Sequence, residues 1–292
     1  MKKVIISLCL CLGLTTFAVA QNTTEEVANP RLTKRGISYL PVAGDIAIGV
    51  NASPFLRYMG NAFNTSSNAA PVFNGVDNTI YLKYFLEDNR ALRVKFNFNV
   101  YQDKLKQTVG NDHAIYVDPT NVDATTIDTR SIFTNDYTLS LGYELRRGHG
   151  RVQGFYGAEL ILGYASGKDT YEYGNEITSS NQAPTFHNWG TSLPSRAIRA
   201  TEYKQGSVLA AGVGAFVGVE YFIAPQLSIG GELGLGYLYS NRSQDVVTGE
   251  YFDNTTGSVV EAQRRFKNAG DTNFSSGLHT TTSGSIFLLF HF

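Results

Sequence analysis

The chain of 292 residues carries 24 lysines and arginines against 25 aspartates and glutamates, and this balance gives no basis for a nucleic-acid partner. It is rich in glycine (29) and in tyrosine and phenylalanine (17 and 18), but it has only 2 cysteines. Beyond the first 20 residues, no apolar run approaches the roughly twenty residues that a membrane-spanning helix needs. This combination is typical of an exported β-barrel.

The first 20 residues have the pattern of a secretory signal peptide. A basic start, an apolar core and a signal-peptidase site follow one another at Lys2-Lys3, residues 4–17 and Ala18-Val19-Ala20. Cleavage before Gln21 would remove Cys9 and Cys11, so no disulfide is expected in the mature chain. Each cysteine follows a leucine, whereas a lipoprotein signal needs a small residue there. We therefore expect a periplasmic N-terminal segment over residues 21–42 and a barrel over 43–292.

Eight segments in which apolar and polar residues alternate with period two predict β-strands. Each is near the nine to eleven residues, roughly, that a tilted membrane strand needs. In the third of them, Leu92 and Val94 alternate with Arg93 and Lys95. In chain order the segments are residues 44–50, 79–86, 92–100, 137–145, 152–164, 209–221, 227–239 and 283–292.

The connections between these segments alternate strictly between short and long. Short turns are predicted at Glu87–Arg90, Arg146–Gly150 and Phe222–Gln226, and long polar loops at about 57–75, 102–130, 166–206 and 240–279. This asymmetry predicts an all-β fold, a closed antiparallel up-and-down transmembrane β-barrel of eight strands with its long loops outside the cell. Residues 245–266 leave open an additional hairpin, and therefore a barrel of eight or ten strands.

The alternation also assigns the two faces of each strand. In an outer membrane the Leu92 row faces lipid and the Arg93 row faces the lumen. The charged residues that share the inner face form a predicted lumen cluster of Lys83, Arg93, Lys95, Glu144, Glu159, Glu220 and Glu232. Because an eight-stranded barrel is filled by its own side chains, we expect these charges to pair as a structural salt-bridge core. A path for protons or ions is the alternative.

Aromatic residues occupy both walls. Phe155 and Phe216 share the inner wall with many glycines, which make room for them. On the outer wall, aromatic residues near the strand ends predict interfacial girdles, and these residues are Tyr84, Tyr101, Tyr143, Tyr164, Tyr221, Tyr237 and Tyr239.

The end of the chain, SIFLLFHF, has apolar residues in phase at Ile286, Leu288, Phe290 and Phe292. It resembles the C-terminal signal that the bacterial outer-membrane assembly machinery recognises. Residues 212–239 resemble the penultimate hairpin of the OmpA/OmpX-like outer membrane β-barrel superfamily, and residues 44–61 resemble the first strand of members from the Bacteroidetes. The resemblance covers about residues 44–292 and implies a barrel in the outer membrane of a Gram-negative bacterium. No peptidoglycan-binding domain follows Phe292, so cell-wall tethering is not implied.

Catalytic and metal-binding patterns were sought among the histidines and the loop acids. His113 and His279 would lie at the outer side, where lipid-modifying barrel enzymes act, but no motif of such enzymes surrounds them. Asp112, Asp118 and Asp123 offer oxygen ligands without the spacing of a calcium loop. We expect no enzyme activity, no metal and no cofactor.

The predicted loop 166–206 carries aromatic residues that are candidates for binding a partner: Tyr171, Tyr173, Phe186, Trp189 and Tyr203. Packing of the loop against its neighbours explains them equally well. We expect a non-enzymatic outer membrane barrel whose loops bind an extracellular ligand or shield the surface. Its other expected partners are the assembly machinery and outer membrane lipid, including lipopolysaccharide. A small pore, or a lipid-modifying enzyme, is the alternative.

Overall fold

The computed structural model describes residues 38–52, 78–148, 150–190, 198–266, 272–274 and 285–292. The predicted signal peptide, most of the N-terminal segment and the predicted loop 57–75 lie outside the described residues. Among the residues that are described, no helix is long and apolar enough to cross a membrane.

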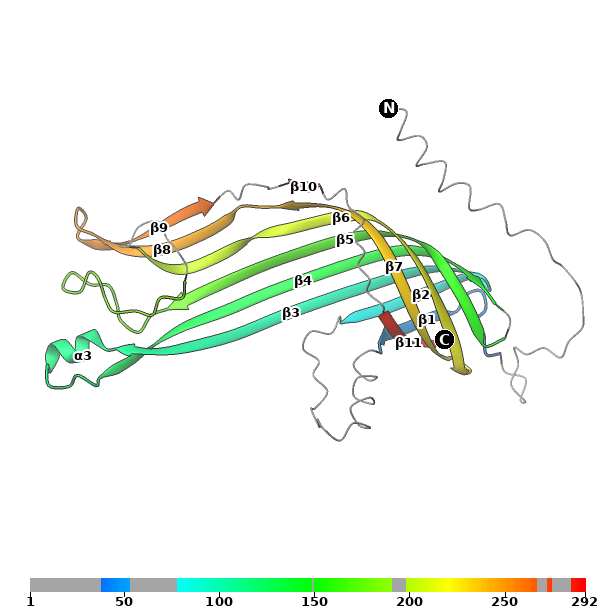
Figure 1. Ribbon diagram of the computed structural model, residues 1–292, viewed down its shortest axis with the longest axis horizontal. Helices are drawn as coiled ribbons and strands as arrows, with labels where there is room; N and C mark the ends of the chain where they lie inside the picture. Colours follow the sequence, from blue (N-terminus) through cyan, green and yellow to red (C-terminus); the bar gives the residue numbers. More distant parts are fainter. Residues whose placement is uncertain (1–37, 53–77, 149, 191–197, 267–271, 275–284) are drawn as a thin grey trace, which may run out of the picture.

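Eight strands are joined edge to edge in a closed antiparallel ring (Figure 1). They are β1 (Ile46–Asn51), β2 (Thr79–Glu87), β3 (Arg90–Gly110), β4 (Thr125–Arg147), β5 (Val152–Glu172), β6 (Arg199–Ala224), β7 (Leu227–Arg242) and β11 (Ser285–His291). Consecutive strands pair from β1 to β7, and β11 pairs with both β7 and β1 to close the ring. The predicted fold class, an eight-stranded antiparallel barrel, is therefore confirmed.

The central strands are much longer than a bilayer requires. Strands β3 to β6 have 21, 23, 21 and 26 residues and continue well beyond the ring (Figure 1). There they join β8 (Asp245–Asp253) and β9 (Ser258–Phe266) in an open sheet of order β3-β4-β5-β6-β8-β9, which we call the protruding sheet. A short helix, α3 (Asp112–Val117), lies at its far end, and a short strand, β10 (Thr272–Phe274), pairs with β7.

Much of the sequence that predicted long loops is therefore strand. Residues 102–110 and 125–130 pair with each other, and β5 and β6 continue into the region that predicted the loop 166–206. These stretches carry polar residues on both faces, because water lies on both sides, so they lack the apolar alternation that indicates a membrane strand. The hairpin over residues 245–266 exists, but it belongs to the protruding sheet and leaves the ring at eight strands.

Asp245 lies at the point where β6 changes its partner strand from β7 in the ring to β8 in the protruding sheet. Along β6, partner β7 ends at Arg242 and partner β8 begins at Asp245. The Asp245 carboxylate accepts hydrogen bonds from Gly206 N (2.7 Å), the Tyr203 hydroxyl (2.8 Å) and Arg242 Nη2 (2.9 Å). A side chain at Gly206 would place a Cβ 1.8 Å from the Ser243 oxygen, so this close backbone approach requires glycine.

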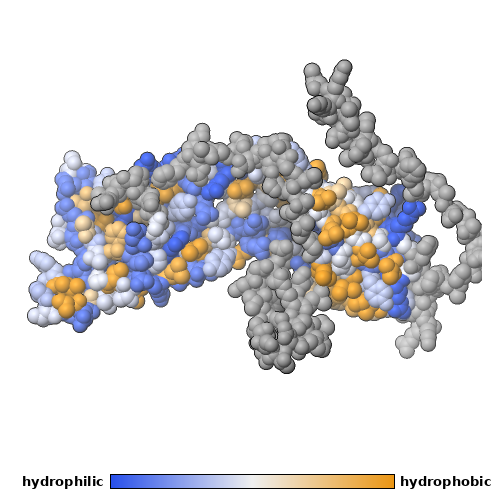
Figure 2. Space-filling model, in the orientation of Figure 1, coloured by the Kyte–Doolittle hydropathy of each residue, from blue (hydrophilic) through white to orange (hydrophobic). Residues whose placement is uncertain are grey.

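The outer wall of the ring is apolar. Ile48 on β1 pairs with Leu82 on β2, and Leu92 on β3 shares their outer face, with exposed fractions of 47, 40 and 46%. Hydrophobic residues gather over the barrel end of the molecule, and hydrophilic residues cover much of the protruding sheet (Figure 2). The prediction for Tyr101 was wrong, because it lies eight residues after Arg93 on an unbroken strand and therefore shares the inner face.

Glycines on the inner wall make room for aromatic rings. A Cβ on Gly157 would lie 2.0 Å from the Tyr143 oxygen and 2.6 Å from Cζ of Phe216. Gly234 also lies on the inner wall, yet a Cβ there would meet nothing closer than the Ala215 oxygen at 3.8 Å. Both glycines therefore lie on the inner face of the barrel, but only the position of Gly234 has room for a methyl group.

We predict that Gly157→Ala destabilises the barrel whereas Gly234→Ala does not. The added methyl group at position 157 meets a backbone oxygen that cannot move without breaking the β4–β5 pairing, and such overpacking costs about 1–3 kcal/mol or more. The free energy of unfolding in urea, followed by intrinsic fluorescence in lipid vesicles, measures the difference. Equal stability of the two variants would contradict this account of the inner wall.

Candidate functional site

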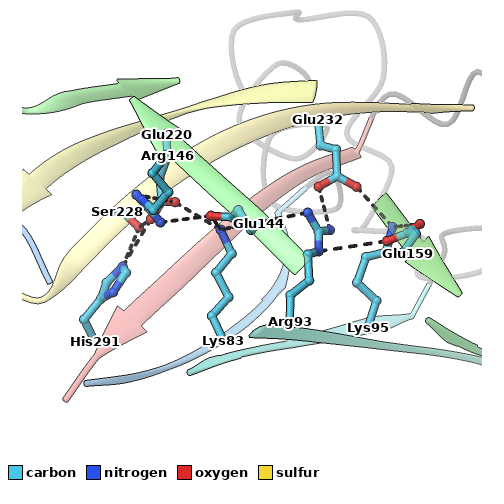
Figure 3. Close-up of polar contacts among 10 residues, drawn as sticks. All are labelled: Lys83, Arg93, Lys95, Glu144, Arg146, Glu159, Glu220, Ser228, Glu232 and His291. Atoms are coloured by element: carbon cyan, nitrogen blue, oxygen red, sulfur yellow. Dashed lines mark hydrogen bonds and ion pairs between the residues drawn. The ribbon is translucent and has the colours of Figure 1, made fainter. Parts of the chain in front are cut away.

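A lysine and two glutamates meet in the lumen (Figure 3), and each lies within a few residues of the strand end that leads into a short turn. Lys83 Nζ on β2 lies 3.0 Å from Glu144 Oε2 on β4 and 3.2 Å from Glu220 Oε2 on β6. Both carboxylate residues are fully buried, and Lys83 is 1% exposed. The lysine therefore reaches across the lumen to two strands that are not its neighbours in the sheet.

The next level of the lumen belongs to Arg93 and Lys95 on β3. Arg93 Nη2 lies 2.6 Å from Glu232 Oε2, and the guanidinium also approaches Glu144 Oε2 at 3.6 Å and Glu159 Oε2 at 4.0 Å. Lys95 Nζ contacts Glu159 Oε1 at 2.8 Å and Glu232 Oε1 at 3.1 Å. The structure thus brings all seven residues of the predicted lumen cluster together, in the predicted orientation.

Sequence reasoning missed a fourth cation. Arg146 was assigned to a turn, but it continues β4 and contacts Glu144 Oε1 at 3.2 Å and Glu220 Oε2 at 3.0 Å. It lies two residues after Glu144, so extending the alternation by one step would have placed it inside. We use the name lumen cluster for Lys83, Arg93, Lys95, Arg146, Glu144, Glu159, Glu220 and Glu232, whose formal charges cancel.

Aromatic rings enclose the cations of the lumen cluster. Arg93 lies over the Phe216 ring at 3.9 Å, and Lys83 lies 4.6 Å from the centre of the Phe155 ring. Arg146 lies 5.2 Å from the centre of the Phe85 ring. Such cation–π contacts are strongest where water is absent, and each of the three phenylalanines is at most 4% exposed.

A serine, a histidine and a glutamate meet at the short-turn end of the lumen. Ser228 Oγ lies 2.9 Å from His291 Nε2 and donates to Glu220 Oε1 at 2.5 Å, and Glu220 Oε1 lies 3.2 Å from the same histidine nitrogen. Catalysis by a serine needs the acid on the opposite ring nitrogen, so that the histidine can take the serine proton. The three residues are at most 3% exposed, and they act as packing partners of the lumen cluster.

The aromatic residues proposed for the loop mostly pack together in the protruding sheet. Tyr171 is 5% exposed and forms a cluster with Ala200 and Val247, against which Tyr173, Trp189 and Tyr203 pack. The Tyr173 hydroxyl donates to the Ala200 oxygen at 2.6 Å, and burial raises the pKa of this phenol. Only Phe186 of the five candidates is exposed, at 40%. The set is therefore not a continuous exposed surface, because its rings anchor residues 173–190 to the sheet.

Two aspartates link the segment after β5 to the far end of the protruding sheet. Asp128 accepts hydrogen bonds from Gly174 N (2.9 Å) and His187 N (2.7 Å). Asp112 accepts from Thr185 N at 2.7 Å and from Asn181. Burial acts to raise the pKa of Asp112, but these hydrogen bonds outweigh it and lower the pKa below its usual value.

Those residues considered for catalysis or metal binding that the structure describes do not form a site. His113 is exposed on α3, and His279 lies outside the described residues. Within the part of the chain that the structure describes, no group of three histidine, cysteine, aspartate or glutamate side chains is placed to hold a metal ion.

Among the described strands, β3 and β9 form the two edges of the protruding sheet and have no further partner there. Strand β2 accompanies β3 only up to the pair Thr79–Asn97, and from Gln102 to Gly110 no described strand lies on that side of β3. Strand β9 forms the opposite edge. On the β3 edge, Lys104 and Lys106 are exposed.

The residues of the predicted assembly signal lie on β11 and at its end. Ile286, Phe290 and Phe292 point outward with exposed fractions of 38, 47 and 69%, and Leu288 shares their face. Phe287 and Leu289 fill the lumen from the other face.

Comparison with known proteins gives little further information. No family model matches the chain, and no curated protein matches it. Among solved structures, a major outer membrane protein from Thermus thermophilus is similar with a TM-score of 0.34 and 13% sequence identity, over 85% of this chain and 98% of that one.

We predict that Arg93→Leu destabilises the barrel strongly. The substitution leaves the Glu232 carboxylate buried with Lys95 as its only remaining cation, and breaking a buried ion pair costs about 3–5 kcal/mol. The double variant Arg93→Leu with Glu232→Gln should recover part of the loss, because the unpaired charge is gone. Urea unfolding in lipid vesicles measures both variants. A single variant as stable as the native protein would show that water enters this level of the lumen.

Proposed function

We propose that this chain is a non-enzymatic integral outer membrane protein of a Gram-negative bacterium. Its barrel is closed by the lumen cluster, and its protruding sheet binds a partner outside the cell. The single observation that carries the proposal is the inverted ring, with charges buried inside and an apolar outer wall. In water such a wall would expose an apolar band around the whole barrel, whereas in lipid it is required.

Two features of the sequence support a location in the outer membrane. A signal peptide over residues 1–20 would export the chain, and the outward apolar residues of β11 resemble the signal that the assembly machinery recognises. With the short turns in the periplasm, the protruding sheet extends from the outer face of the membrane.

A closed lumen is favoured over a pore. Glu144, Glu220, Lys83 and Arg93 are at most 2% exposed, and rings of Phe155 and Phe287 pack around them. An ion would have to separate these buried pairs, which costs several kcal/mol for each charge. A steady pore would need a rearrangement of the whole lumen cluster.

Binding by the edge of the protruding sheet is favoured over binding by flexible loops. An unpaired strand offers a row of N–H and C=O groups to which an extended segment of another protein can add. Lys104 and Lys106 discourage pairing between two copies of this edge, and they favour a partner strand with acidic side chains. We therefore assign the β3 edge, residues 102–110, as the binding surface for an extended acidic segment.

Location and closure can be tested together. We expect the protein in the outer membrane fraction, with an electrophoretic mobility that differs between unboiled and boiled samples, because a closed ring has no edge from which to unzip. In planar bilayers the purified protein should show no steady conductance. A soluble periplasmic protein, or a conductance altered by changing Glu159 or Lys83, would refute the proposal. Altered lipid A that depends on His113 or His279 would favour the enzyme alternative.

The edge is tested by Lys104→Pro and Leu105→Pro, made separately. Successive N–H groups of a strand point to opposite sides, so one proline removes a donor on the open edge and the other removes a donor to β4. We expect the proline on the open side to abolish capture of an acidic β-strand peptide while the barrel remains heat-modifiable. Exposed Phe186→Ala serves as a control that leaves both edges intact. Unchanged peptide capture by both proline variants would contradict edge binding.

A further inference from the structure

A cavity of about 620 Å³ opens where the ring meets the protruding sheet. We call it the mouth chamber. Its walls come from β3 to β7 and from Asn78 just before β2, and the side chains that matter here are Asn99, Tyr101, Thr134, Asp136, Gln205 and Arg242. It lies beyond the lumen cluster, toward the long strands, and none of its walls belongs to the open edge over residues 102–110.

Polar side chains lead from the lumen cluster up to the chamber. Asn97 follows Lys95 on the inner face of β3 and donates to Thr79 Oγ1 at 3.0 Å, and Asn99 donates to Asn97 Oδ1 at 3.2 Å. The base of the chamber is therefore formed by hydrogen-bonding amide and hydroxyl groups. Its volume falls in the range of roughly 300–1,000 Å³ that small-molecule sites occupy.

The chamber contains one cation, Arg242, and one carboxylate, Asp136, and the two differ in whether an ion-pair partner is present among the described residues. Arg242 donates to Asp245 at 2.9 Å, so its charge already has a partner. Asp136 lies eight residues before Glu144 on unbroken β4 and therefore faces inward, and it is exposed. Among the described residues no cation forms an ion pair with Asp136, so its carboxylate is an acceptor that a ligand can use.

An aromatic ring stands beside these acceptors. Tyr101 is 54% exposed, and its hydroxyl is held by Asp103 Oδ2 at 3.0 Å. One face of this ring can pack against C–H groups, while amides such as those of Asn99 and Gln205 both donate and accept. A sugar has the matching chemistry, because its hydroxyls donate and accept around a ring of C–H groups.

We propose that the mouth chamber binds the end of a neutral oligosaccharide, of roughly two or three sugar units for a cavity of this size. Asp136 accepts from two neighbouring hydroxyls, and Asn99 and Gln205 contact others. The Tyr101 ring packs on one sugar face. An anionic saccharide is disfavoured, because its charge would meet Asp136 while Arg242 is engaged by Asp245. This function uses different residues from the β3 edge and does not depend on it.

Isothermal titration calorimetry tests the proposal with the full chain in lauryldimethylamine oxide, a detergent without a sugar headgroup. The probes are maltotriose and the trimer of N-acetylglucosamine. We expect at least one of them to bind, and Asp136→Ala and Tyr101→Ala each to weaken binding by roughly tenfold or more, because hydrogen bonds to a charged acceptor are among the stronger ones.

The control is Phe133→Ala, which removes an outward-facing ring from the same region of β4 and should leave sugar binding unchanged. Every variant is first shown to keep the native shift between unboiled and boiled mobility. Absence of heat for both neutral trimers overturns the proposal, as does binding that survives both chamber variants. Tighter binding of a galacturonic acid trimer overturns the assignment to a neutral sugar. Edge variants at positions 104 and 105 should leave the titration unchanged, which separates this site from the edge.

Discussion

The pairing of buried charge inside a narrow ring is the constraint on which the rest of the barrel depends. Eight strands enclose just enough space for the side chains that point inward, so each charge on the inner wall must find its partner across the lumen. Glu144 shows how completely this is met, because its two oxygens contact Lys83, Arg93 and Arg146. Balanced charge and enclosing rings together make the lumen a core, although its chemistry is that of a polar interior.

The alternation in the sequence was enough to predict which charged residues lie in this core, but not which cation pairs with which carboxylate. Period two assigns a face to every residue once one reference is known, and Leu92 with Arg93 provides it. Which cation meets which carboxylate depends on the stagger between strands around the ring, and the alternation of a single strand does not encode stagger. Lys83 and Glu220 lie 137 residues apart and on opposite sides of the lumen, so their contact could be found only in three dimensions.

Strand ends were the other limit of the sequence. In the membrane, lipid outside and charge inside produce a clear alternation, and beyond it water on both faces removes that signal without removing the strand. Residues 102–110 and 125–130 therefore look like a loop and fold as a hairpin. Arg146 was missed at the opposite end for another reason, because β4 continues through residues that predicted a turn. Tyr171 and Tyr203 were candidates for recognition because they fell in an apparent loop, yet they lie on strands and pack inside the sheet.

The inner wall and the outer end of the molecule tolerate change very differently. Gly157 leaves space for the Phe216 ring, and that ring lies against Arg93, so one glycine supports an aromatic contact, a cation–π contact and the ion pairs of Arg93. By contrast, Asp136 and Lys104 are exposed, and none of the described contacts of the lumen cluster depends on them. Substitutions at the mouth chamber or the β3 edge can therefore alter a binding specificity without disturbing the barrel. A sealed, mutually dependent core is what allows the exposed end of the same strands to vary.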